Sequence, residues 1–159
     1  MSLLPFFEWC ERTAAGEAIR NSLWLFPVIE SFHLLALALI GGAVLVVDLR
    51  LLGLVLRRQP LADLAREAQR WLAGGLAVMI VTGLALFSSE AIKCYYNLAF
   101  WTKMSALAPA IVFAFTVRRK VAAADESRLR PLWRKLTALV SIALWFVVAA
   151  SGRWIGFSG

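Results

Sequence analysis

Four long apolar runs alternate with short polar segments along the chain. They cover residues 28–48, 71–89, 98–117 and 136–152. Each run has about the 17–25 residues that an α-helix needs to cross the hydrocarbon of a bilayer. A soluble domain would interrupt such runs with charged side chains every few residues. The pattern therefore predicts an all-α membrane protein, a bundle of four transmembrane helices in a single integral membrane domain that takes up the whole chain.

The first 20 residues follow another pattern. Their apolar side chains are Leu3, Leu4, Phe6, Phe7 and Trp9, and these alternate with the charged Glu8, Glu11 and Arg12. One apolar and one polar face are typical of a helix that lies in the membrane interface rather than across it. We therefore predict an N-terminal amphipathic interfacial helix.

The distribution of basic residues predicts the orientation. The chain is 61% hydrophobic, and its net charge is +7. Of its 17 Lys and Arg residues, five lie in residues 49–70 and seven in residues 118–135, which leaves five for the other side. Because cytoplasmic loops collect Lys and Arg, both segments are expected in the cytoplasm, with both termini periplasmic, in a bacterial inner membrane. The same rule explains the positive charge without a nucleic-acid partner.

The first apolar run carries the candidate chemistry. Glu30, the only histidine, His33, and Asp48 fall within about 80° of arc when successive residues turn by 100°. Because a charged group facing lipid is costly, this helix face is expected to look into the protein.

Depth along the predicted helices brings further groups to the same level. At 1.5 Å per residue, Glu30 and His33 lie about 14 Å and 10 Å outward from the centre of their run. A cluster is therefore expected in the outer third of the bundle; its members are Glu30, His33, Glu90, Lys103, Ser151 and Arg153, and Met104 lies at a compatible depth. Asp48 falls at the inner end, where Arg50 or Arg118 would pair with it.

Three functions fit this cluster. In the first, His33 is an axial ligand of a b-type haem and Lys103 and Arg153 neutralise its propionates, with Glu30 also at the site. With one histidine, the sixth iron position would be empty, filled by Met104, or supplied by another chain.

In the second, Glu30, His33 and Lys103 conduct protons or a cation in a transport or coupling subunit. In the third, the protein is a non-catalytic subunit of a membrane complex. A chain this small is expected to form a homo-oligomer or to join other subunits. The structural alternative is that Glu30 pairs with Lys103 or Arg153 to pin helices together, or hydrogen-bonds to His33.

Two smaller patterns carry their own predictions. Cys10 and Cys94 both fall on the expected periplasmic, oxidising side, so they form either a disulfide or two free thiols. The pairs Gly41-Gly42 and Gly74-Gly75, together with Gly83, are typical of positions at which membrane helices pack closely.

Several of these residues carry a resemblance. Glu30-x-x-His33, Gly41-Gly42 and Asp48-Leu-Arg50, followed by Asn97-x-x-Phe100-Trp101-x-Lys103, resemble an uncharacterised bacterial four-helix membrane family over most of the chain. More distantly, the chain is similar to the copper-resistance protein D membrane domain and to HemJ-type protoporphyrinogen oxidases, which bind haem. That resemblance implies that His33 matches the first-helix ligand and Lys103 the third-helix lysine. Many such proteins carry a further histidine near the inner end of the third helix, where this chain has Phe115-Thr116-Val117-Arg118.

Overall fold

The computed structural model describes residues 3–124 and 130–157, and in these residues it contains helices and no strand. Four helical stretches are long and apolar enough to cross a membrane, as the sequence predicts. They are α3 (Leu25–Leu51), α4 (Leu61–Ser89), α6 (Leu98–Phe113) continued through the π-helical turn η1 (Ala114–Arg118) into α7 (Arg119–Ala123), and α8 (Pro131–Ile155). The chain thus has the architecture of a multi-pass membrane bundle.

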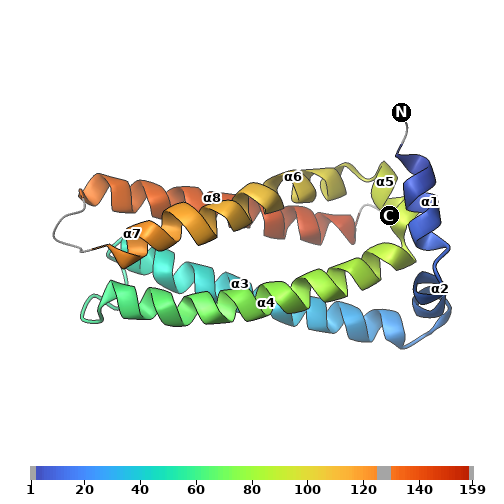
Figure 1. Ribbon diagram of the computed structural model, residues 1–159, viewed down its shortest axis with the longest axis horizontal. Coiled ribbons are helices and arrows are strands. Elements are labelled where there is room, and N and C mark those ends of the chain that lie inside the picture. The colour runs from blue at the N-terminus through green and yellow to red at the C-terminus, as the bar shows by residue number, and fades with distance from the viewer. Residues whose placement is uncertain (1–2, 125–129, 158–159) are drawn as a thin grey trace.

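The four long stretches are arranged as two antiparallel pairs (Figure 1). Helix α3 runs beside α4, α6 runs beside α8, and α3 also packs against α8. The side chains between them are apolar and fully buried, as at Ile40, Leu72 and Val148. The outward surface is apolar too, as Val81 and Phe146 show with about two thirds of their surface exposed. An apolar exterior of this kind suits contact with lipid.

The two ends of the bundle differ in the segments that lie there, and we name them accordingly. The terminal end carries the short helices α1 (Leu4–Glu11), α2 (Ala14–Asn21) and α5 (Ala91–Tyr96), and the loop end is where α3 passes into α4 (Figure 1). Exposed tryptophans lie near both ends. They are Trp9, Trp24, Trp101 and Trp154 at the terminal end and Trp71 and Trp133 at the loop end. Such aromatic belts are typical of the two interfaces of a bilayer.

The N-terminal segment forms two helices instead of the single one expected. Helix α1 ends at Glu11, and Thr13 starts α2 because its hydroxyl accepts a hydrogen bond from the amide of Gly16 at 3.3 Å. A Cβ on Gly16 would lie 2.2 Å from the carbonyl oxygen of Ser88, so only glycine lets α2 approach α4 this closely. The two helices therefore cover the end of α4 as a cap.

Aromatic packing attaches α1 to the bundle. The ring of Phe7 lies 5.3 Å from that of Phe87, 5.2 Å from Tyr95 and 6.2 Å from Phe100, all edge to face. The indole of Trp101 donates a hydrogen bond to the carbonyl of Tyr95 at 2.9 Å. The Phe100-Trp101 part of the sequence motif thus has a structural role at this end.

Candidate functional site

A cavity of about 430 Å³ opens between the two helix pairs at the terminal end, within the ~300–1,000 Å³ range of ligand pockets. Five residues of the predicted cluster line it, namely Glu30, His33, Glu90, Lys103 and Arg153. Helix α3 contributes the first two, α4 and its C-cap contribute Glu90, α6 contributes Lys103 and α8 contributes Arg153. We call this the terminal-end cavity.

The imidazole of His33 is half-buried and held by α4. Its Nδ1 lies 2.9 Å from the hydroxyl oxygen of Thr82. That hydroxyl donates its hydrogen to the carbonyl of Val78 at 2.7 Å, so it accepts from Nδ1–H. The proton of a neutral imidazole is therefore on Nδ1, and the lone pair is on Nε2.

Glycine at position 83 makes this orientation sterically possible. A Cβ there would lie 3.2 Å from Cε1 of His33 and 3.8 Å from Nδ1, so the Nδ1–Cε1 edge of the ring faces α4. Nε2 lies more than 4 Å from that Cβ, and His33 also forms a hydrogen bond with the backbone of Met79. Thr82 was missed by the sequence analysis, although it is the only hydroxyl residue between Trp71 and Phe87.

Lys103 reaches the cavity across a second glycine. A Cβ on Gly152 would lie 3.4 Å from Nζ of Lys103 and 3.5 Å from its Cε, so the lysine side chain lies along α8. Within residues 3–124 and 130–157, Glu30 forms no ion pair with Lys103 or Arg153. The helix-pinning pair of the structural alternative is thus not formed, nor is a hydrogen bond between Glu30 and His33.

The remaining charges form the rim of the cavity. Lys93 and Glu90 form an ion pair at 3.8 Å with 42% of each side chain exposed. The guanidinium of Arg153 lies over the ring of Phe157, 4.6 Å from its centroid. Basic and acidic groups thus surround the opening, while His33 and Lys103 lie deeper.

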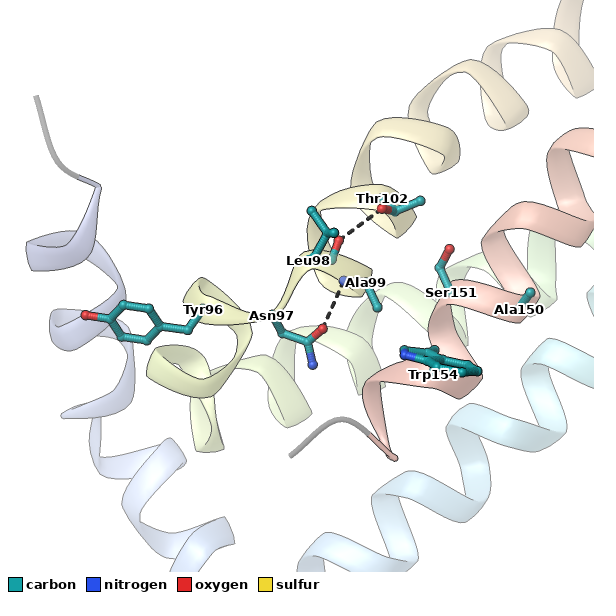
Figure 2. A pocket seen from close by; sticks show the side chains of 8 residues that line it. All are labelled: Tyr96, Asn97, Leu98, Ala99, Thr102, Ala150, Ser151 and Trp154. Carbon is teal, nitrogen blue, oxygen red and sulfur yellow. Dashed lines mark hydrogen bonds between the residues drawn. The ribbon is translucent and has the colours of Figure 1, made fainter.

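The candidate ligand Met104 and the cluster member Ser151 lie elsewhere. Met104 is 46% exposed on the outer face of α6 and does not line the terminal-end cavity. Ser151 lines a separate hollow between α6 and α8, opposite Ala99 and Thr102 (Figure 2). There Asn97 caps α6, because its Oδ1 accepts a hydrogen bond from the amide of Ala99 at 2.9 Å.

Both cysteines are free thiols in the structure, which is the second of the two alternatives that the sequence left open. Cys94 lines the terminal-end cavity and packs with Cys10 in the apolar cluster around Phe7. Burial, with the nearby carboxylate of Glu90, raises the pKa of Cys94 to about 11, so its thiol stays protonated near neutral pH. In the described parts of the chain, no group of three His, Cys, Asp or Glu side chains is placed to hold a bare metal ion.

Asp48 belongs to a different site at the loop end. Its Oδ1 accepts a hydrogen bond from Nε of Arg118 at 2.8 Å, and both side chains are buried. Arg118 also donates to the carbonyls of Ala43 and Val44. Of the two partners that the sequence left open, Arg118 is thus the one used; Arg50 instead donates to carbonyl oxygens in the loop that follows α3.

An apolar layer separates this ion pair from the terminal-end cavity. Between His33 and Asp48, the most deeply buried side chains of α3 are Ala36, Ile40, Val44 and Val47, with at most 3% of each exposed. Val148 of α8 completes the layer with no exposed surface. The cavity and the ion pair are therefore two independent polar sites.

Comparison with known proteins identifies the family. A protein-family model described as a family of unknown function, DUF6644, matches residues 6–158. No curated protein and no solved structure gives a significant match. The expected membership of an uncharacterised family is thus confirmed, whereas the more distant similarity to the copper-resistance protein D membrane domain and the HemJ-type oxidases is not shown.

Proposed function

We propose that this chain, which belongs to the DUF6644 family, is a b-type haem-binding redox or haem-handling membrane protein whose haem is bound in the terminal-end cavity. The observation that carries the proposal is the orientation of His33. The hydroxyl of Thr82 engages Nδ1, which leaves Nε2 as the ring nitrogen that would hold the haem, and His33 lines the cavity. Metal-binding histidines are typically oriented in this way by a hydrogen bond on their other nitrogen.

The other residues of the cavity fit the same group. Lys103 and Arg153 would hold the two propionates, and apolar side chains such as Leu37, Met79 and Phe87 would surround the macrocycle. Bound haem would supply one-electron chemistry or be itself the molecule that is passed on. Because Met104 faces away from the cavity, it would not hold the haem, whereas His33 would.

The alternative is a cation- or proton-conducting subunit. The shared position of Glu30, His33 and Lys103 in one cavity supports it. The apolar layer between His33 and Asp48 counts against it, because conduction needs a polar path to the other end of the bundle. A binding function needs the cavity alone and therefore has the stronger support. A non-catalytic role in a membrane complex is the third alternative.

The proposal includes an orientation of the chain in the membrane. We place the loop end in the cytoplasm of a bacterial inner membrane and the terminal-end cavity at its periplasmic surface, since the loop end carries most of the basic residues. The exposed apolar surface is in contact with the lipid bilayer and with further copies of the chain or other subunits. No nucleic acid is expected as a partner.

An absorption spectrum tests the function. The purified protein, titrated with hemin in detergent, should develop a Soret band that His33→Ala abolishes while helicity by circular dichroism is unchanged. Thr82→Val should weaken haem binding about 10- to 100-fold, since it removes the acceptor that orients the ring. Thr102→Val is the matched control, because the exposed Thr102 hydroxyl donates to the carbonyl of Leu98 within its own helix. Met104→Leu should also leave the spectrum unchanged.

Two results would contradict the proposal. The first is a folded preparation that binds no hemin, and the second is a Soret band of the same intensity and affinity in His33→Ala. The conducting alternative instead requires pH-dependent flux in proteoliposomes that is lost in Glu30→Gln.

A further inference from the structure

A second basic site lies at the loop end of the bundle. A cavity of about 480 Å³ opens between the beginning of α4 and the segment formed by η1 and α7. Four arginines line it, Arg66, Arg70, Arg118 and Arg119, together with Gln69. Its other lining residues are alanines and Val47, and among the residues that the structure describes no acidic side chain lines it. We call this the loop-end cavity.

Most of its positive charge is free to attract an anion. Arg118 is committed to Asp48, but Arg119 is exposed and has no ion pair within the described residues. Arg66 and Arg70 form long pairs of 3.8 and 3.6 Å with acidic side chains on the solvent side of α4. All members of these two pairs are 59–74% exposed, and such surface pairs stabilise by at most about 1 kcal/mol. A ligand anion would therefore meet little competition for the three guanidiniums.

Gln69 supplies an independent sign of a ligand. Its side-chain Nε2 is buried, yet it has no hydrogen-bond partner among the residues that the structure describes. A buried amide group without a partner costs about 1–3 kcal/mol, so most such groups in proteins are bonded to something. Gln69 lines a cavity rich in arginine, so a rotation of its side chain would bring the amide to an oxygen acceptor with negative charge bound there.

We propose that the loop-end cavity binds the phosphate group of an anionic phospholipid. Guanidinium groups bind phosphate oxygens with two parallel hydrogen bonds, and the amide of Gln69 would donate a further one. The depth of the loop-end cavity in the membrane suits a lipid headgroup. Trp71 lies on the next turn of α4 and is 55% exposed, as is typical of a tryptophan at the membrane interface. Basic pockets between helices at this level are suited to anionic headgroups. The alanines of α4 and α7 give the glycerol part an apolar wall.

The site is tested by native mass spectrometry of the full chain in a zwitterionic detergent. Phosphatidylglycerol should give a population with one bound lipid, whereas phosphatidylcholine at the same concentration should not. Arg119→Gln should weaken phosphatidylglycerol binding roughly fivefold, the effect of removing one basic residue near a charged surface. Gln69→Glu should weaken it further, because the change is nearly isosteric and places a carboxylate against the phosphate.

Arg58→Gln is the matched control. Arg58 is exposed at the same end, lies outside the cavity, and its change removes the same charge as Arg119→Gln. Binding that falls equally in Arg58→Gln and Arg119→Gln would show general attraction to the basic end and overturn the proposal, as would binding unaffected by Gln69→Glu. Displacement of the lipid by millimolar inorganic phosphate would support the phosphate site and assign it to a soluble anion.

Discussion

Replacing Arg118 by alanine should lower the free energy of unfolding by about 3–5 kcal/mol, because it leaves a buried carboxylate without its cation. Asp48 has no exposed surface and Arg118 is 3% exposed, so solvent screens their interaction weakly. Besides the 2.8 Å contact with Asp48, the guanidinium donates to two carbonyls of α3 at 3.1 and 3.3 Å. Hydrogen bonds to a charged group contribute about 1.5–3 kcal/mol each, though such values do not add.

A graded series separates the charge from the geometry. Arg118→Lys keeps the charge but replaces the planar fork by one ammonium, so an intermediate loss of about 1.5–3 kcal/mol is expected. The double change Asp48→Leu with Arg118→Met should be closer to the wild-type stability than either single change, since it leaves no buried charge unpaired. Arg58→Ala, at an exposed position of the same end, should change stability by less than about 0.5 kcal/mol.

The unfolding free energy would be measured in mixed micelles by titrating a denaturing detergent and following helicity by circular dichroism. The coupling energy then follows from the double-mutant cycle. The reasoning would be refuted by an Arg118→Ala protein as stable as the wild type. It would equally be refuted by a double mutant whose loss equals the sum of the two single losses.

Three further predictions concern single positions. Gly83→Ala should weaken hemin binding with little loss of helicity, since the new methyl group would lie 3.2 Å from the His33 ring; a spectrum identical to wild type would contradict this. Gly75→Ala should lower the free energy of unfolding by about 1–3 kcal/mol, because its Cβ would lie 2.8 Å from an isoleucine side chain of α3. In the same unfolding assay Gly74→Ala should be neutral or stabilising, since its Cβ would have nothing within 4 Å. Cys94 should react with iodoacetamide at pH 8 roughly 100-fold more slowly than a thiol of ordinary pKa 9.0, and faster as the pH rises toward 11; a rate like that of a small thiol would refute its burial.

The positions of the long helices follow from the sequence because the length of an apolar run is a direct consequence of bilayer thickness. Their exact ends do not. Helix α4 begins at Leu61, ten residues before the expected span, because the amphipathic segment 61–70 continues the same helix beyond the membrane. Helix α3 begins at Leu25 and includes Pro27, since the first turn of a helix needs no donor from that residue.

The cluster at the terminal end was predictable for a similar reason. Depth along a helix is fixed by residue number, so Glu30, His33, Lys103 and Arg153 come to one level whatever the packing. The direction of a side chain around the helix axis is set by the neighbouring helices instead. Met104 is one residue from Lys103, and the 100° turn between them is enough to place it on the outer face. For the same reason Thr82 was not recognised as the partner of His33.

A glycine on the facing helix positions each of the two deep polar side chains of the terminal-end cavity. His33 on α3 lies against Gly83 of α4, and Lys103 on α6 lies against Gly152 of α8. The pair α3–α4 therefore orients His33, the pair α6–α8 orients Lys103, and the cavity lies between the two pairs. The separation of imidazole and ammonium then depends on how closely α3 packs against α8 in the apolar layer below, where Ile40 is fully buried. By contrast, a Cβ added to Gly41, Gly42 or Gly74 would have nothing within 4 Å. The close packing expected at these three positions is therefore absent from the described residues. A glycine of this bundle therefore positions a side chain only where the facing helix places that side chain against it.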